Sequence, residues 1–308
     1  MTATSSFAYS HTVGFLANTG RGFNNPVDVA LDSQGILYVL NRAGPETALR
    51  LPYKRVVMCT VDEEYLGEFG TGGTGDGHFW WPSALAFDSE DRLYVADEAL
   101  QRVSIFTKAG ELLGQWGSHG SQDGQLDRPS AMAFDSEDNM YLTDSLNHRV
   151  QKFSKDGTFL GKWGEEGDGP GQFNMPWGVA LDRNGDVYVS DWRNDRVQKF
   201  DPSGRYLAQW GSSGDGEGQF NRPSGLALDP DGNIYVCDWG NERVQVLSPS
   251  GQVLACFRGD SVTSTWASSY FEANPDEGAA RLAAHLEPQI KPRSDHHPET
   301  SATVEKLL

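Results

Sequence analysis

Short apolar segments separated by polar turns recur along most of the chain. From Pro26 to Gly259, runs of about four to seven residues rich in Val, Ile, Leu, Phe and Tyr alternate with Gly, Asp and Asn. Apolar runs of this length, bounded by turn residues, are typical of β-strands. The same region shows no sustained helical period. We therefore expect an all-β structure here.

The apolar segments form a repeat. Copies begin at Pro82, Pro129, Pro176 and Pro223, which lie 47 residues apart. An earlier copy begins at Pro26 and is longer, because extra residues lie around 43–53. Each copy predicts four strands, which in the second copy cover residues 83–88, 92–97, 101–106 and 111–116. Four strands in each period of this length indicate the blade of a β-propeller.

The sequence of each copy resembles the NHL repeat. The copy that begins at Pro176 carries the motif most fully, in residues 178–182, 186–191, 194–200 and 204–211. Five consecutive copies extend over residues 26–258, which is most of the chain. The resemblance implies a propeller of six blades. It also implies a binding role, since NHL propellers often recognise partners, including RNA in some cases, although some NHL proteins are metal-dependent lyases.

The ends of the repeat region predict how the ring closes. Residues 9–26 resemble only the last strand of a copy and its exit loop, and no sixth copy follows Gly259. We therefore expect five full blades and an incomplete sixth blade. Either the chain is a truncated form of a longer protein, or its C-terminal tail fills the gap. Because open strand edges can pair with another chain, a homodimer through the open blade is also expected.

The sequence divides into an NHL propeller, residues 1–259, and a C-terminal tail, residues 260–308. Asn274, Pro275 and Glu277 form a good helix start, and Pro288 ends that helix. The tail should therefore carry one short helix in an otherwise irregular segment.

Composition narrows the function classes. The 308 residues contain 25 Lys and Arg against 43 Asp and Glu, a net charge of −18. This acidic balance opposes binding to a phosphate backbone, so nucleic acid is not the expected partner. No apolar run reaches the roughly 18 residues of a membrane span. The three Cys lack disulfide or metal spacing. We expect a soluble cytoplasmic protein with no membrane segment.

Residues that recur in the copies are expected to be structural. An Asp ends each second strand and an Arg begins the third strand five residues later, so the two can pair across the loop between them. The Asp residues are Asp97, Asp144, Asp191 and Asp238, and the Arg residues are Arg102, Arg149, Arg196 and Arg243. Recurring Trp residues predict packing between blades: Trp116, Trp163 and Trp210.

Residues that break the repeat are the candidates for function. In a propeller, the loops between second and third strands and the loops between blades open at one end, here called the top face, where repeat proteins carry function. Asp28 stands where other copies have Ala or Gly. It is a candidate catalytic base or metal ligand. The alternative is a solvated carboxylate in an imperfect first copy.

The insertion in the first copy and several aromatic residues are candidates for ligand binding. The insertion brings together cations that could hold a carboxylate or phosphate, or pair with nearby acidic loops: Arg42, Arg50, Lys54 and Arg55. Exposed Trp residues can stack on sugars, bases or cations, anchor a protein partner, or simply cover the channel. The candidates are Trp81, Trp177, Trp192 and Trp239.

Three histidines on top-face loops are candidate metal ligands together with Asp28: His78, His119 and His148. Some NHL enzymes bind a metal through His residues around the channel, but their ligand pattern is not reproduced here. Two functions remain. The favoured one is a scaffold that recognises a protein or small anionic ligand on its top face. The alternative is a metal-assisted lyase or hydrolase of small molecules, with a divalent metal as cofactor at the channel mouth.

Overall fold

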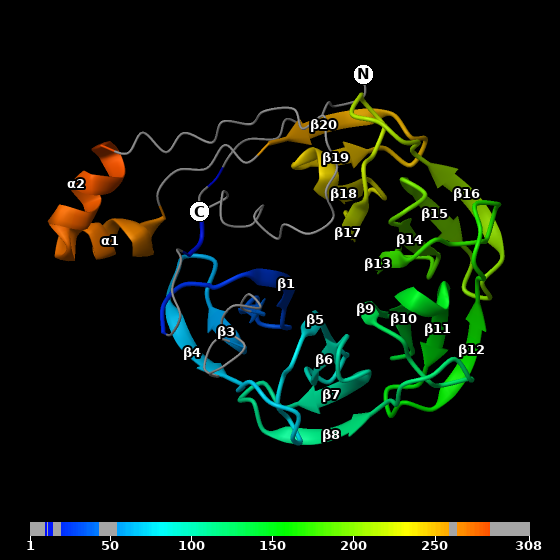
Figure 1. The fold of residues 1–308 in the computed structure, drawn as a ribbon, viewed down its shortest axis with the longest axis horizontal. Coiled ribbons are helices and arrows are strands. Elements are labelled where there is room, and N and C mark those ends of the chain that lie inside the picture. The colour runs from blue at the N-terminus through cyan, green and yellow to red at the C-terminus, as the bar shows by residue number, and fades with distance from the viewer. Residues whose placement is uncertain (1–9, 11, 15–19, 43–53, 259–263, 284–308) are drawn as a thin grey trace.

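The computed structural model describes residues 10, 12–14, 20–42, 54–258 and 264–283, with side chains as far as residue 280. These residues form five antiparallel sheets of four strands each. Figure 1 shows the sheets as blades around a central axis, with the first strand of each blade innermost and the fourth outermost.

The blades follow one another in sequence order. Blade 1 contains β1 (Pro26–Leu31), β2 (Leu37–Asn41), β3 (Arg55–Cys59) and β4 (Tyr65–Phe69). Blade 2 contains β5 (Pro82–Phe87), β6 (Leu93–Asp97), β7 (Arg102–Phe106) and β8 (Leu112–Trp116). Blade 3 contains β9 (Pro129–Phe134), β10 (Met140–Asp144), the turn η2 (Ser145–Asn147), β11 (Arg149–Phe153) and β12 (Phe159–Trp163). Blade 4 contains β13 (Pro176–Leu181), β14 (Val187–Asp191), β15 (Arg196–Phe200) and β16 (Tyr206–Trp210). Blade 5 contains β17 (Pro223–Leu228), β18 (Ile234–Asp238), the turn η3 (Trp239–Asn241), β19 (Arg243–Leu247) and β20 (Val253–Phe257).

The prediction of four strands in each copy is confirmed, but the prediction of an incomplete sixth blade is wrong. Among the described residues there are five blades and no part of a sixth sheet. The segment before Pro26 resembles a last strand in sequence, yet its described residues contribute only a bridge residue, Phe23. Gly14, Gly20 and Gly22 have φ values of 91°, 64° and 104°, which interrupt an extended strand.

Apolar side chains between neighbouring sheets form the core. Between blades 2 and 3, Tyr94 and Val103 pack with Met140 and Phe153, and none of these side chains is accessible to solvent. The recurring Trp residues lie over these interfaces, as predicted. Ring centroids are 4.6 Å apart in Trp116–Phe153 and 5.7 Å in Trp163–Phe200, and each pair joins two neighbouring blades. Trp210 stacks on Tyr188 of its own blade at 5.6 Å and packs against the apolar cluster between blades 4 and 5.

Hydroxyl groups join the inner parts of blades 2, 3 and 4 to the blade that follows each of them. Each hydroxyl donates to a backbone carbonyl of the following inner strand: Ser83 to Pro129 at 2.7 Å, Ser145 to Pro176 at 2.5 Å and Ser190 to Ser224 at 2.5 Å. The Ser224 hydroxyl, at the end of the row, bonds instead to Cys237 of its own blade, at 3.4 Å. These bonds hold the inner strands side by side around the channel.

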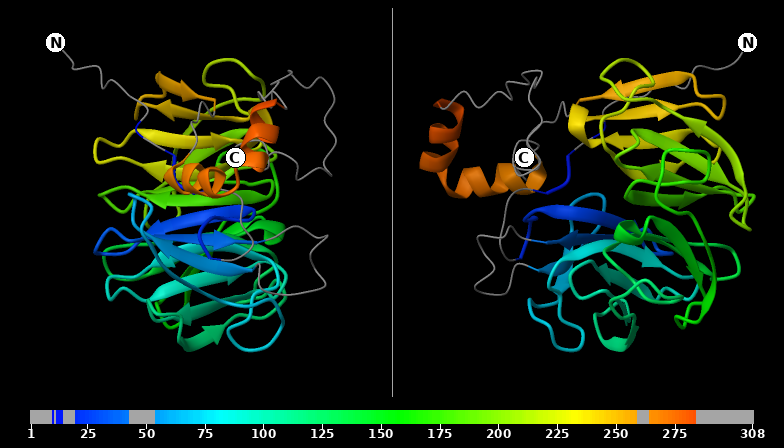
Figure 2. Two further views of the ribbon diagram at one scale, coloured as in Figure 1. Left: turned by 90° about the vertical axis from the view of Figure 1, so that its left-hand side faces the viewer. Right: turned by 45° about the vertical axis from the view of Figure 1, so that its right-hand side comes forward.

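Helix α1 (Thr265–Ala273) packs on the face of blade 1 that lies away from blade 2, and α2 (Pro275–Ala283) turns away from it (Figure 2). Trp266 is 5% exposed and lies in a cluster with Val39 and Val57 of blade 1. Its ring centroid is 6.0 Å from that of Phe23 and 6.5 Å from that of Tyr65. The tail therefore covers part of the exposed end of the ring.

Polar contacts fix this tail against blade 1. One carboxylate oxygen of Glu63 accepts from the Gly14 N–H at 2.6 Å and the other from the Trp266 N–H at 3.0 Å. The Trp266 indole N–H donates to the Glu63 carbonyl. The predicted helix start at Pro275 is confirmed, whereas α1 was not predicted. None of the described helices is long and apolar enough to cross a membrane.

Candidate ligand-binding site at the channel mouth

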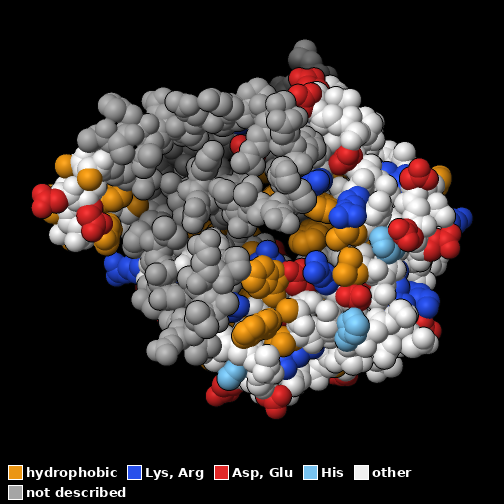
Figure 3. Space-filling model, viewed as in Figure 1, with side chains coloured by type: hydrophobic (Ala, Val, Ile, Leu, Met, Phe, Trp, Pro, Cys, Tyr) orange, Lys and Arg blue, Asp and Glu red, His pale blue; other side chains and the backbone are white. Residues whose placement is uncertain are grey.

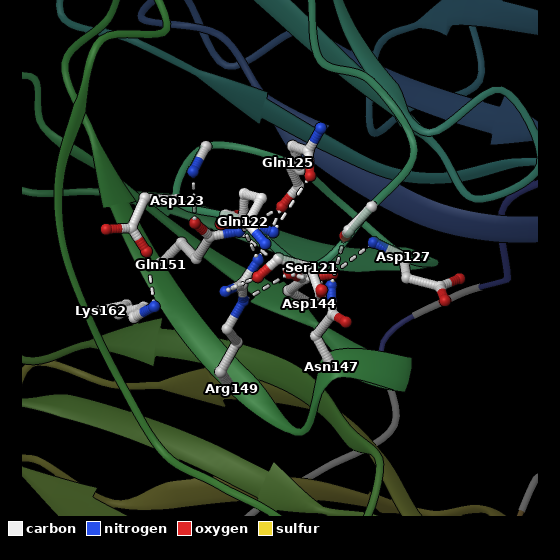
Figure 4. Close-up of polar contacts among 12 residues, drawn as sticks. Ser121, Gln122, Asp123, Gln125, Asp127, Asp144, Asn147, Arg149, Gln151 and Lys162 are labelled. Carbon is white, nitrogen blue, oxygen red and sulfur yellow. Dashed lines mark hydrogen bonds and ion pairs between the residues drawn. The ribbon is translucent and has the colours of Figure 1, made fainter.

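A buried carboxylate network supports the top-face loops. Asp144 accepts from Asn147 Nδ2 at 2.9 Å, Arg149 Nε at 2.8 Å and Gln151 Nε2 at 2.9 Å (Figure 4). The Arg149 guanidinium then donates to three carbonyls of the loop that enters the blade, in residues 121–125. The same pairs form in blades 4 and 5, so the predicted structural role of these Asp and Arg residues is confirmed there.

Blade 2 departs from this network. Among the described residues, Asp97 forms no ion pair with Arg102. It still accepts from the backbone N–H groups of Trp80 and Trp81, as Asp144 does from that of Asp127. Arg102 likewise still donates to loop carbonyls, including that of His78 at 2.8 Å. The top-face loop is therefore still fixed, although the ion pair predicted for this copy is absent.

The first side-chain cluster at the mouth lies between blades 1 and 2. The Arg42 guanidinium lies 4.7 Å from the ring centroid of Trp81, and its Nη1 lies 3.2 Å from a Glu98 carboxylate oxygen. Burial lowers the pKa of Arg42 and raises the pKa of Glu98, and their mutual attraction opposes both shifts. We call Arg42, Trp81 and Glu98 the blade 1–2 triangle. Its positive charge is balanced by its own carboxylate.

The other cations that were predicted to bind a ligand differ in how accessible their side chains are. Lys54 is buried, donates to the Trp80 carbonyl, and has Nζ 4.9 Å from the Trp80 ring centroid. Arg55 is only 1% exposed, donates to the Gly22 carbonyl at 3.1 Å and pairs with Glu68. This burial contradicts the prediction of Arg55 as a ligand-binding residue. Arg55 occupies the recurring structural Arg position, which the insertion obscures. Arg50 lies outside the described residues.

The second cluster lies between blades 4 and 5. The Trp192 ring centroid is 6.1 Å from that of Trp177 and 6.5 Å from that of Trp239. The Arg222 guanidinium lies 5.0 Å from the Trp192 centroid, and the Arg193 guanidinium 5.7 Å. We call Trp192, Arg222 and Trp239 the blade 4–5 triangle. In the part of the chain that is described, neither Arg193 nor Arg222 forms an ion pair, unlike Arg196 and Arg243 beneath them.

The two triangles use equivalent positions of the repeat. Each triangle contains the residue that follows the second strand of one blade. The next blade contributes two residues, the one before its first strand and the one after its second strand. The cation and the aromatic ring exchange positions between the two triangles. In the first triangle Arg42 follows the second strand and stacks on Trp81 of the next blade. In the second triangle Trp192 follows the second strand and Arg222 of the next blade stacks on it. Figure 3 shows hydrophobic and basic side chains gathered around the central hollow of this face.

Asp28 lies on the inner strand β1 and joins blade 1 to blade 2. Its carboxylate accepts from the Leu85 N–H at 2.7 Å and from the Val29 N–H at 2.9 Å. Burial raises the pKa of Asp28 to about 6, although both hydrogen bonds lower it. Burial also raises the pKa of the Cys237 thiol, and the Asp28 charge adds to that effect. Because both carboxylate oxygens accept from the backbone, Asp28 takes the place of the hydroxyl bonds found between the later blades.

The candidate metal ligands are not brought together. His119 Nε2 lies 3.7 Å from Asp127, while His148 Nδ1 accepts from the Met175 N–H at 3.3 Å. His78 lies in the loop between blades 1 and 2. Among the described residues, no group of three or more His, Cys, Asp or Glu side chains could hold a metal ion. Asp28 and these histidines therefore do not form a metal centre in this part of the chain.

The NHL repeat family model matches residues 173–200 and 220–247, which span blades 4 and 5. Over 86 residues the chain is 33% identical to NHL repeat-containing protein 3 of Homo sapiens. The chain is a β-propeller that contains NHL repeats. That alignment covers 28% of this chain and 23% of the human protein, so it spans less than a quarter of the relative.

Solved structures with the same fold are distant in sequence. Virginiamycin B lyase from Staphylococcus aureus, solved with quinupristin, is 13% identical, with a TM-score of 0.55 over 78% of this chain and 70% of that chain. A chain of the nidogen/laminin complex is 15% identical, with a TM-score of 0.55 over 76% of this chain and 80% of that chain. These likenesses show the fold alone.

Sequence reasoning missed several residues of the NHL propeller's mouth. Glu98, Arg128, Arg193 and Arg222 were not among the candidates, although Arg42 and Arg128 both lower the pKa of Glu98. Two of these residues could have been found from the repeat, because Arg128 and Arg222 directly precede the Pro that begins a copy. Both have φ of 56°, in the left-handed region that bulky side chains rarely adopt.

Replacing Asp28 by Asn should stabilise the NHL propeller at neutral pH. The native state binds the Asp28 proton more tightly than the unfolded chain, so wild-type stability falls as pH rises from about 4 to about 6. The Asp28→Asn variant has no carboxyl group to titrate, so its stability does not fall in this way, and its amide oxygen can still accept from the Leu85 N–H. A rise from 3.8 to about 6 sets an upper limit of about 3 kcal/mol on the gain.

Urea denaturation at several pH values tests this prediction. The stability difference between Asp28→Asn and wild type should grow between pH 4 and 6 and then stay constant. The control is Asp201→Asn, because hydrogen bonds hold the pKa of the exposed Asp201 at about 2, so its removal should give no gain. A difference for Asp28→Asn that does not change with pH would contradict the assignment.

Proposed function

We propose that this NHL propeller is a recognition scaffold, and that it binds a protein or small anionic ligand on its top face. The observation that carries the proposal is the pair of Trp and Arg triangles at the channel mouth. Trp and Arg dominate the binding energy of protein interfaces, because each offers a large contact area together with directional hydrogen bonds.

Stacking prepares the arginines for binding. A guanidinium on an indole ring is held in one plane, and its N–H groups stay free to meet a carboxylate or phosphate. Arg222 and Arg193 meet this description over Trp192. The protein as a whole carries −18, so an anionic partner is repelled elsewhere and favoured at this cluster. The same net charge disfavours long polyphosphates such as nucleic acids.

The alternative, a metal-assisted lyase or hydrolase, has weaker support. A lyase is among the structural neighbours, but at 13% identity. The candidate ligands Asp28, His78, His119 and His148 do not come together among the described residues. Asp28 also has both oxygens engaged by backbone N–H groups.

Partner capture with matched variants tests the recognition role. Trp192→Ala removes the ring at the centre of the second cluster, and should weaken partner binding at least about tenfold. The control is Leu207→Ala, since Leu207 is 41% exposed on the outer strand β16, away from the mouth. Equal capture by both variants would contradict the top-face site. One equivalent of a transition metal retained through dialysis, and lost with Asp28→Ala, would instead favour the enzyme.

A further inference from the structure

We infer that the blade 4–5 triangle, with Arg193, is a subsite for a carboxylate that lies beside an aromatic side chain in an acidic peptide. The inference rests on the proposed recognition function and names its ligand chemistry. It follows from what differs between the two triangles.

The difference is a single position. In the blade 1–2 triangle the residue after the second strand of the following blade is Glu98, 3.2 Å from Arg42. In the blade 4–5 triangle that position is Trp239, whose ring contacts Trp192. The first triangle therefore supplies its own anion. The second keeps two guanidinium groups, of Arg193 and Arg222, that no described carboxylate neutralises.

Three carboxylates of the two blades that form this subsite are already engaged. Asp195 accepts the Arg222 backbone N–H at 2.7 Å through one oxygen, and the Ser213 hydroxyl through the other. Asp191 and Asp238 are buried and pair with Arg196 and Arg243. The bond from Asp195 also fixes the backbone of Arg222, directly before Pro223. Because the backbone at Arg222 is already held in place, less conformational entropy is lost when its side chain binds a ligand.

Aromatic surface lies next to these charges. Trp239 is 37% exposed, and Trp177 lies on the other side of Trp192. A ligand that pairs with Arg222 through a carboxylate would place its neighbouring group against these indole rings. An aromatic side chain suits that surface, because aromatic rings pack favourably against one another. An acidic peptide offers both features with few charges, whereas a polynucleotide would bring a long anionic backbone toward a protein of charge −18.

Titration with a pair of peptides tests the inference. The acidic probe is acetyl-Glu-Phe-Asp-Phe-Glu-amide, and the neutral probe replaces its acids by Gln and Asn. The acidic probe should quench Trp fluorescence and bind at least about tenfold more tightly than the neutral one at about 0.1 M salt. Most of that advantage should disappear at about 1 M salt, because the charges are exposed and screened.

Variants locate the subsite. The double variant Arg193→Gln with Arg222→Gln should remove the preference for the acidic probe. Trp239→Glu should do the same, because it introduces the carboxylate that the blade 1–2 triangle already has. The matched control is Arg183→Gln, which removes an exposed guanidinium from the β13–β14 hairpin at the opposite end of the propeller. It should bind the acidic probe like wild type, and the variants should melt like wild type.

Three results would overturn the inference: equal binding of the two probes, an unchanged preference in both the double variant and Trp239→Glu, or binding of a single-stranded RNA oligonucleotide with none of the acidic probe. None of these removes the recognition role itself. If Trp192→Ala still lost its captured partner while Arg193 and Arg222 proved unimportant, the mouth would remain the site and only the ligand chemistry would be wrong.

Discussion

Replacing Trp266 by Ala should destabilise the protein by about 3 kcal/mol. Its ring is 5% exposed and fills the space between Phe23, Tyr65 and blade 1. The substitution leaves a cavity and also removes the indole N–H that bonds to the Glu63 carbonyl. Because α1 is fixed to blade 1 by this residue, we expect the helix to detach.

Urea denaturation and hydrogen exchange test this prediction. Amide protection should fall first in β2 and β3, whose face Trp266 covers, while blade 3 should remain protected. Tyr270→Ala is the matched control, because Tyr270 lies on the same helix but is 37% exposed. It should cost less than about 1 kcal/mol. Similar losses for the two variants would show that the Trp266 contact does not hold the tail.

The second large effect is expected for Asp191→Ala. Asp191 has no accessible surface and accepts from Asn194 Nδ2 at 2.8 Å and Arg196 Nε at 2.9 Å. Removing the carboxylate leaves the buried Arg196 charge without its partner, which typically costs about 3–5 kcal/mol. The Arg196 bonds to the loop before blade 4 should weaken as well.

Thermal and urea denaturation of Asp191→Ala should therefore show a large loss of stability, whereas Asp201→Ala should show a small one. Asp201 lies in an exposed hairpin and pairs with an Arg205 side chain that is 76% exposed. Exposed ion pairs contribute at most about 1 kcal/mol. A loss below about 1 kcal/mol for Asp191→Ala would mean that the backbone alone holds the top-face loop.

The blades could be predicted from the sequence because each of their features recurs in several copies of the repeat. A single apolar run is ambiguous, but the same run followed by Asp and then Arg in successive copies fixes strands, turns and ion pairs together. The exception in blade 2 has a local reason: Leu100 and Ser104 replace the Asn and Gln that complete the network around Asp144.

Neither the contacts at the ends of the ring nor the side-chain triangles at the channel mouth could be predicted in the same way. Trp266 and Glu63 meet across 203 residues of sequence. Trp266 lies outside the repeat, and Glu63 stands in the first copy where the later copies have Gly. The triangles depend on side chains from two neighbouring blades, and a repeat alignment compares equivalent positions rather than contacting ones. The insertion hid the structural role of Arg55 because it moved that residue away from the expected spacing.

The hydroxyl bonds between inner strands make this propeller easy to lengthen or shorten. Blades 2, 3 and 4 each bond forward to the inner strand that follows, and Ser224 satisfies its hydroxyl within blade 5, after which the described residues form no further strand. A tandem duplication of 47 residues would supply Ser224 with a new carbonyl and leave every earlier bond unchanged. The gene could therefore gain or lose one copy in a single event, and selection would act on how the two ends then meet.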